Sequence, residues 1–243
     1  SKAVLLTLIG LQAISADVLI PSSIKAFHQG DSLTGNGAAL QIINGSGMSK
    51  PDANDPTTWT ISSTAWADDW QGFSADNSGN NTWAVLDLGA RTANLDQMYL
   101  WNVQETNALD RGTSKFNVYY ASSPSESVPD TSGAVTPYDF KSGDWTLLST
   151  GNDLAQGTQI GDPGEVFDIS RASGARYIGL HLTANHGGFR TGLAEVVFTT
   201  GIPNGVAGVT NLAADGITSA SAQLRGKVDD IGDAPPSITI RWG

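Results

Sequence analysis

Three turn-rich stretches of the sequence, residues 61–81, 107–112 and 185–190, together offer aromatic rings and side chains that form hydrogen bonds. In residues 185–190, two glycines separate His186 from Phe189 and Arg190. An aromatic ring can stack on the apolar face of a sugar while a few polar groups fix the sugar hydroxyls. This chemistry is recognition, in which no covalent bond changes. The candidate ligand-binding residues are Trp66, Trp70, Phe73, Asn107, Arg111, His186, Phe189 and Arg190.

Plainer interpretations of the same residues stay open. Tryptophan is usually highly buried, so each Trp is also a candidate for the core. Loop residues such as His186 and Phe189 are often solvated without binding anything. Arg111 can tie down its own loop through a carboxylate such as Glu105 or Asp110. Binding, core and surface roles are therefore all compatible with these stretches.

Enzymatic motifs are missing from the sequence. It contains no Gly-x-Ser-x-Gly elbow, no His-Glu-x-x-His and no phosphate-binding loop. His28, His181 and His186 are too scattered to suggest a triad. The absence of cysteine excludes disulfides, thiolate nucleophiles and cysteine-based zinc sites. A carboxylate pair of the glycosidase kind stays open among 24 acidic residues. We predict a binding domain without catalytic residues.

The charge balance narrows the class of partner. The formal net charge is −11. Binding to a phosphate backbone or to anionic lipid depends on clustered Lys and Arg, so nucleic acid and direct membrane docking are disfavoured. Neutral glycans, or a site that contains a divalent cation, fit better. An acidic surface can also serve solubility alone.

The hydrophobic pattern predicts an all-β fold. Short runs rich in Val, Ile, Leu and aromatic residues are separated by Gly, Asn, Asp, Ser and Pro. In one run, Ile178, Leu180 and Leu182 alternate with residues of the opposite face. Many short strands with long connections indicate a jelly-roll β-sandwich. The expected strands are residues 17–20, 24–27, 39–43, 83–88, 97–103, 115–121, 145–149, 165–169, 176–183 and 194–200.

Several short stretches follow one another in a fixed order within residues 35–201: residues 83–89, 100–102, 111–112, 116–120, 144–145, 175–178 and 193–198. Their order and spacing resemble the discoidin or coagulation-factor C-type family of galactose-binding-like domains, and the chain is similar to carbohydrate-binding module family 32. The resemblance implies a jelly roll whose loops at one end bind glycans. Independently of the resemblance, the strand patterns assign seven aromatic residues to the core: Trp83, Trp101, Phe116, Tyr120, Trp145, Tyr177 and Phe198.

The resemblance also implies a structural calcium ion between an early loop and the last strand. The matching positions are Asn44, Ser46, Ala194 and Glu195. Calcium takes six to eight oxygen ligands, many of them backbone carbonyls. Asn44 stands where relatives more often have Asp, which removes one charge. An Asn-Gly turn and a surface-facing Glu195 are the alternatives to a metal site.

Composition divides the chain into four parts. Residues 1–16 combine Lys2 with an apolar run and small residues, a pattern typical of a secretory signal peptide. Residues 17–201 are the expected sandwich and residues 202–206 a linker. Residues 207–243 resemble the opening strands of a fibronectin type III-like, immunoglobulin-like module and are too few for a complete core. We expect a natural chain that continues into further domains.

These observations predict a non-catalytic extracellular domain, secreted or on a bacterial cell surface, that tethers a larger protein to a glycan or polysaccharide. The alternative is a structural or adhesion domain that contacts other proteins in a surface array. A weaker alternative is an appendage of a polysaccharide-degrading enzyme. Calcium is the cofactor to consider.

Overall fold

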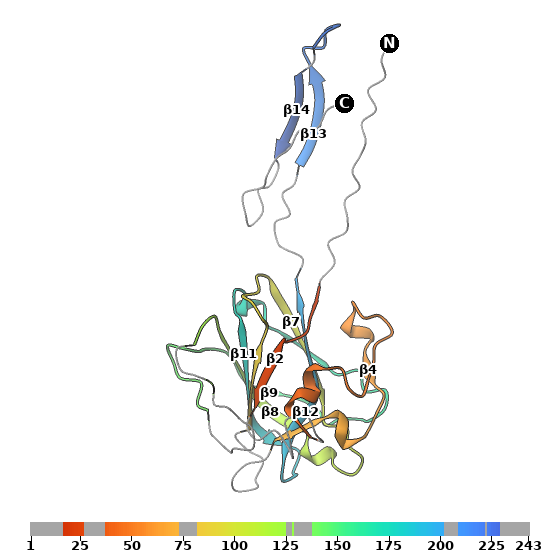
Figure 1. Cartoon of the computed structure of the whole chain (residues 1–243), viewed down its shortest axis with the longest axis vertical. Helices are drawn as coiled ribbons and strands as arrows, with labels where there is room; N and C mark the ends of the chain where they lie inside the picture. The colour runs from red at the N-terminus through yellow and green to blue at the C-terminus, as the bar shows by residue number, and fades with distance from the viewer. Residues whose placement is uncertain are drawn as a thin grey trace.

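The computed structural model describes residues 17–26, 37–72, 82–124, 128, 138–201, 209–221 and 223–228. Two five-stranded antiparallel sheets pack face to face in a jelly-roll β-sandwich, as the sequence predicts (Figure 1). The first sheet contains β1 (Val18–Leu19), β12 (Thr191–Thr200), β7 (Leu95–Asn102) and β10 (Glu165–Asp168), with β5 (Trp70–Gly72) paired to β12. The second contains β2 (Ser23–Ala26), β6 (Thr82–Asp87), β11 (Tyr177–Asn185), β8 (Thr113–Ala121) and β9 (Thr146–Asp153).

Short elements complete the described chain. Two small antiparallel pairs are β3 (Met48–Ser49) with β4 (Thr60–Ile61), and β13 (Val209–Asp215) with β14 (Gln223–Val228). Within the described residues every helix is a 3-10 segment of three to five residues: η1 (Ala39–Ile43), η2 (Pro56–Thr58), η3 (Trp66–Asp68), η4 (Leu109–Arg111) and η5 (Ser170–Ala172).

One predicted strand is wrong. Residues 39–43 form η1, which buries Ala39, Ile42 and Ile43. A spacing of three residues matches the period of a 3-10 helix and not the alternation of a strand. The run is therefore a regular element, as predicted, but a helical one.

Several predicted segments lie outside the described residues, among them the signal peptide, residues 1–16, the linker, residues 202–206, and Phe73. The pair β13–β14 falls in the segment expected to open a second module. Its fibronectin type III-like fold, and the domain boundaries themselves, stay predictions.

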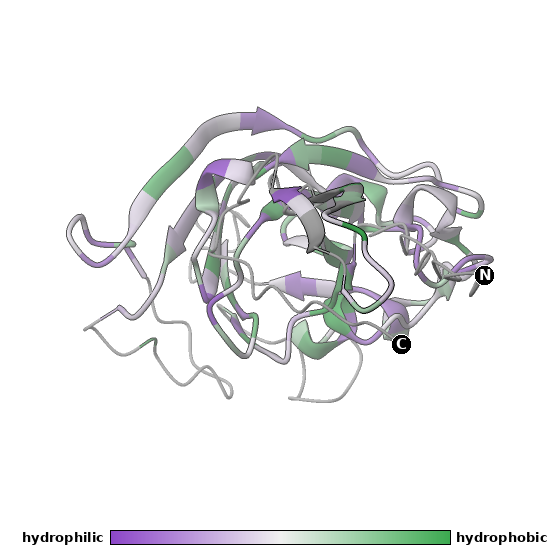
Figure 2. Ribbon diagram, turned by 90° about the horizontal axis from the view of Figure 1, so that it is seen from above, coloured by the Kyte–Doolittle hydropathy of each residue, from purple (hydrophilic) through white to green (hydrophobic). Residues whose placement is uncertain are grey.

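Strand alternation builds the main core between the sheets. Ile178, Leu180 and Leu182 of β11 are fully buried against residues such as Leu100 and Val196 of the first sheet. Figure 2 shows hydrophobic and hydrophilic residues following one another along the strands. The alternation in β11 was predicted and is confirmed.

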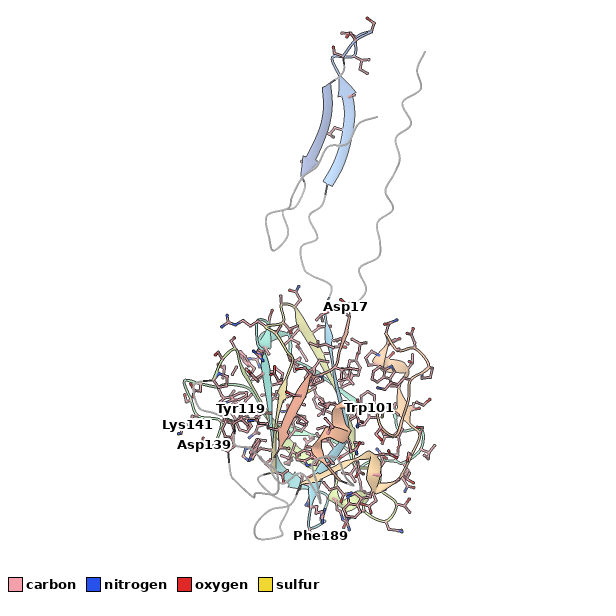
Figure 3. The ribbon with its side chains drawn as sticks, viewed as in Figure 1. Asp17, Trp101, Tyr119, Asp139, Lys141 and Phe189 are labelled. Atoms are coloured by element: carbon pink, nitrogen blue, oxygen red, sulfur yellow. The ribbon has the colours of Figure 1, made fainter. Side chains whose placement is uncertain are left out.

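Aromatic residues form two further clusters on the outward faces of the sheets. The outer aromatic cluster of the second sheet comprises Trp83, Val85, Ala121, Tyr138, Phe140 and Trp145. The first sheet carries Trp59, Tyr99 and Trp101. Figure 3 places Tyr119, which packs on the outer aromatic cluster, and Trp101 on opposite sides of the sandwich. The aromatic residues predicted for the core are buried except Tyr120 and Tyr177, which are partly buried.

Candidate functional site

Two connections form one end of the sandwich, here called the loop end. They are residues 103–112, between β7 and β8, and residues 186–190, between β11 and β12. Figure 3 shows Phe189 at this end, with Asp17 at the opposite end. The amide of His186 donates to the carbonyl of Gly112 at 3.1 Å, and the amide of Gly188 donates to the carbonyl of Asp110 at 2.9 Å. Residues 107–112 and 185–190, which are far apart in the sequence, therefore form one surface.

The turn at residues 186–190 is fixed by the last residue of β11. The Asn185 side-chain amide donates to the carbonyls of Gly188 and Arg190 at 2.7 and 2.8 Å. Its oxygen accepts from the amide of Gly187 at 2.9 Å. A Cβ atom on Gly188 would lie 2.8 Å from Cγ of Arg111, so only glycine allows this approach. The turn is therefore ordered before any ligand arrives.

Phe189 is the exposed aromatic residue of the loop end. It is 47% exposed. The Arg111 guanidinium carbon lies 4.6 Å from the centroid of its ring, and that of Arg190 lies 5.7 Å away. Arg190 also lies 5.4 Å from the ring of the half-buried Trp66. We call Phe189, Arg111, Arg190 and Trp66 the Phe189 platform; all four were predicted as binding residues.

Arg111 is held in place by a polar network. Its Nη1 atom donates to Gln71 Oε1 at 2.9 Å and to Glu105 Oε2 at 3.1 Å. Gln71 Nε2 donates to the same Glu105 oxygen at 2.5 Å. The tie to Glu105 was predicted as the structural role of Arg111. Gln71 was not, because it comes from β5 and nothing in its local sequence marks it.

A buried acid lies beneath this network. Asp69 Oδ1 accepts from Gln71 Nε2 at 3.1 Å, and Oδ2 accepts from the amides of Gln104 and Glu105, each at 3.3 Å. Burial raises the pKa of Asp69 to about 7, although the hydrogen bonds from Gln71 and Gln104 act in the opposite direction. Asp69 therefore links β5 to the loop that carries Arg111.

The other predicted binding residues are placed differently. Trp70 is fully buried in the main core on β5, so we exclude it from the ligand surface. The side chain of His186 is half-buried, with Nε2 at 3.1 Å from the Leu154 carbonyl, and it ties two connections together. Asn107 is exposed in a turn with φ of 66°. Phe73 lies outside the described residues.

The predicted metal residues are brought together at a different place. Glu195 of β12 is fully buried, and its Oε2 atom accepts from the amide of Gly45 at 3.1 Å. Asn44 Oδ1 accepts from the amide of Ser46 at 2.8 Å, so it already has a donor. Ala194 lies in the neighbouring aromatic cluster of the first sheet. Among the described residues, no group of three or more His, Cys, Asp or Glu side chains could hold a metal ion. Calcium stays a prediction.

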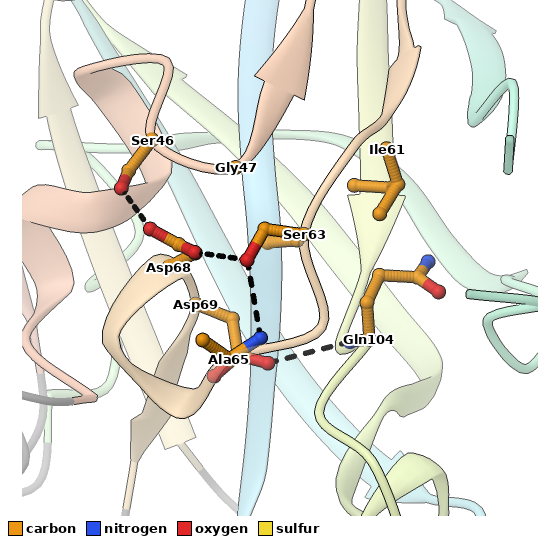
Figure 4. A pocket seen from close by; sticks show the side chains of 9 residues that line it. Ser46, Gly47, Ile61, Ser63, Ala65, Asp68, Asp69 and Gln104 are labelled. Carbon is orange, nitrogen blue, oxygen red and sulfur yellow. Dashed lines mark hydrogen bonds between the residues drawn. The ribbon is translucent and has the colours of Figure 1, made fainter. Parts of the chain in front are cut away.

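A small hollow adjoins the loop of Ser46 (Figure 4). Asp68 accepts hydrogen bonds there from the hydroxyls of Ser46 and Ser63. The hollow leaves no room even for a molecule the size of water, so it cannot hold a sugar ring. The candidate glycan surface is therefore the Phe189 platform. No helical segment in the described part of the chain is long and apolar enough to cross a bilayer.

Comparison with known proteins finds similarity at the level of solved structures. No family model and no curated protein matches the chain. The lectin-binding domain of lectinolysin, in complex with Lewis b, is 16% identical, covering 74% of this chain and 92% of that one, with a TM-score of 0.43. An F5/8 type C domain from Bacteroides fragilis is 11% identical, with coverage of 76% and 97% and a TM-score of 0.48.

A third similar structure is the family 32 carbohydrate-binding module of C. perfringens NanJ in complex with galactose. It is 12% identical, with coverage of 75% and 98% and a TM-score of 0.42. With TM-scores below 0.5, these proteins assign no role to a residue of this chain.

Proposed function

We propose that this chain is a non-catalytic carbohydrate-binding domain that stacks a sugar ring on Phe189 at the loop end. The observation that carries the proposal is a ring that is 47% exposed and yet supported by the Arg111 guanidinium at 4.6 Å. A cation on an aromatic ring is worth about 0.5–1 kcal/mol at an exposed site. This support orients the ring before a ligand binds, which lowers the entropy lost on binding.

Polar groups suited to sugar hydroxyls surround the ring. Arg111 is 21% exposed and is partly neutralised by Glu105, so the pair offers both a donor and an acceptor without a strong net charge. Asn107 is exposed on the same connection. An aromatic face bordered by paired donors and acceptors suits a pyranose more than a phosphate backbone, which requires clustered cations.

We propose further that the domain works outside the cell and tethers a larger protein to glycan. Support comes from the apolar run after Lys2 and from the second pair of strands, β13–β14, which follows the sandwich. Contacts with other proteins in a surface array are the alternative function for the same exposed ring.

The first test is a glycan array probed with the full chain, with Phe189→Ala and with Phe189→Tyr. We expect selective glycan binding by the unaltered chain. Phe189→Ala should weaken it by about tenfold or more, because one stacked ring contributes on the order of 1.5 kcal/mol. Phe189→Tyr keeps the ring and should retain most of the affinity.

The matched control is Val166→Ala, which removes an exposed apolar side chain from β10. Both Phe189→Ala and this control should change the melting temperature by only about 1–2 °C, as is usual for surface positions. If the folded, stable chain bound no glycan on the array, the glycan proposal would be rejected and a protein partner would be favoured. Full affinity in Phe189→Ala would place the sugar elsewhere.

A further inference from the structure

Glu195 is a buried carboxyl group that its hydrogen bonds do not fully satisfy. It lies in the middle of β12, fully buried. Oε2 accepts from the amide of Gly45 at 3.1 Å, whereas Oε1 is buried and has no hydrogen-bond partner. A carboxylate in such a place is strongly destabilising unless a cation or a proton neutralises it. Either a cation or a proton must therefore neutralise this carboxyl group.

The side chain of Lys50 brings such a charge to this place. An ideal Cβ atom on Gly45 would lie 2.2 Å from Lys50 Nζ and 2.9 Å from Cε. The ammonium group thus rests against the residue whose amide binds Glu195. Nζ also lies 4.1 Å from the centroid of the buried Trp59 ring, which attracts a cation. Burial raises the pKa of Glu195, whereas the charge of Lys50 lowers it and so favours the ionised carboxylate.

The oxygen atoms around Glu195 are poorly arranged for calcium. The side-chain oxygen of Asn44 accepts from the amide of Ser46, and the hydroxyl of Ser46 donates to Asp68. The second carboxylate oxygen of Asp68 accepts from the hydroxyl of Ser63. Calcium would have to replace these bonds to collect six or more oxygen ligands. The nearby ammonium would also repel a divalent ion. The residues present do not fit calcium.

We propose that Lys50 is the resident cation of this site: its ammonium group supplies the positive charge for Glu195 and holds the loop of Gly45 against β12 without a metal. The motif that suggested calcium is then retained as a protein-only contact between the loop before β3 and the last strand of the sandwich. This inference does not depend on glycan binding.

The first experiment compares the melting temperature of the full chain in excess calcium and in excess EDTA. We expect the two values to agree within about 1 °C, since a ligand that does not bind the native state leaves stability unchanged. A calcium-dependent rise of several degrees would overturn the proposal. This comparison needs no variant, so it decides even if a substitution prevents folding.

The second experiment replaces each partner. Lys50→Met keeps most of the side-chain bulk, and removing the cation beside a buried carboxylate should lower the melting temperature by roughly 5–10 °C. Lys115→Met is the control: Lys115 forms an exposed ion pair with Asp153, and its loss should cost less than about 2 °C.

The double variant Lys50→Met/Glu195→Gln tests whether the two charges act on each other. Glu195→Gln should restore part of the stability lost in Lys50→Met, because it removes a buried charge that has lost its partner. Losses that simply add in the double variant would show that Lys50 and Glu195 are independent, and would reject the proposal.

Discussion

Two groups of aromatic residues, the Phe189 platform and the outer aromatic cluster, differ in what covers their rings. Phe189 rests on the Arg111 guanidinium and is 47% exposed. Trp145, in the outer aromatic cluster, is 4% exposed, and Phe140 and Tyr138 meet its ring edge to face. A ring that packs on a guanidinium group keeps exposed surface for a ligand, whereas a ring that is surrounded by other aromatic rings does not. Under the proposed function, the exposure of a ring, and not the number of aromatic residues nearby, decides whether it can stack on a ligand.

The outer aromatic cluster is built as a second core. Phe140 stacks on Tyr119 with centroids 4.6 Å apart and an interplanar angle of 6°. Gly179 makes room for it, because a Cβ atom there would lie 2.3 Å from Phe140 Cε1. Phe140 also has φ of 48°, which is unfavourable for a bulky residue. Packing must offset this strain, which indicates a structural role.

The largest effect should come from Trp145→Ala. It removes a buried ring and the hydrogen bond that Trp145 Nε1 donates to the Tyr138 hydroxyl at 2.7 Å. We expect a loss of about 3–5 kcal/mol in the free energy of unfolding, measured by urea denaturation. Glycan affinity of the folded variant should not change.

Leu147→Ala is the control for Trp145→Ala, because Leu147 is 50% exposed on the adjacent strand β9. It should cost no more than about 0.5 kcal/mol. If Trp145→Ala removed glycan binding at little cost in stability, the outer aromatic cluster would be the ligand surface and the comparison would be reversed.

Gly188→Ala should disturb the Phe189 platform specifically. The new Cβ atom would meet Cγ of Arg111 at 2.8 Å and the backbone of Asp110 at 2.9 Å, which forces the two connections apart. We expect about 1–3 kcal/mol of destabilisation and at least a tenfold loss of glycan affinity, measured by calorimetry. Gly201→Ala is the control, because Gly201 lies at the other end of β12 and has room for a Cβ atom. It should change neither the stability nor the glycan affinity. Unaltered affinity in Gly188→Ala would mean that platform geometry does not control binding.

The sheets were predictable because strand pairing follows local alternation. Ile178, Leu180 and Leu182 mark one face of β11 without any knowledge of partners. The apolar run at residues 39–43 has no alternation, so sequence alone does not distinguish a strand from η1. Trp70 looked like a loop residue among acidic neighbours, yet pairing of β5 with β12 buries it.

The candidate surface was predictable only in part. Phe189, Arg190 and Arg111 stand in turns bordered by glycine, and a glutamate near an arginine suggests an ion pair. The sequence alone was therefore enough to select these residues. Gln71 and Asp69 act through contacts with residues more than thirty positions away. Lys50 meets Gly45 and Trp59 only after the chain has folded. Such roles depend on tertiary geometry, which carries no local signature.

A pH dependence of stability should separate the two regions. The pKa of Asp69, raised from 3.8 to about 7, means that the folded chain binds a proton more tightly than the unfolded chain in that interval. Its contribution to stability therefore falls as the pH rises toward 7. Burial lowers the pKa of His181, near Phe140, so its contribution is lost as the pH falls below about 6.5.

The opposite pH dependences of the Asp69 and His181 contributions can be separated by measuring melting curves across pH. Asp69→Asn should lessen the fall in stability toward neutral pH and leave the loss in acid; the fall that remains belongs to Glu195, whose pKa burial also raises. Asp110→Asn removes an exposed charge from the same connection and should preserve the profile. His181→Gln should instead lessen the loss of stability that begins below about pH 6.5 and leave the loss at lower pH, to which Asp87 and Asp168 contribute through their lowered pKa values. A profile in Asp69→Asn that matches the parent chain would mean that Asp69 stays ionised through neutral pH, with its three N–H donors outweighing its burial.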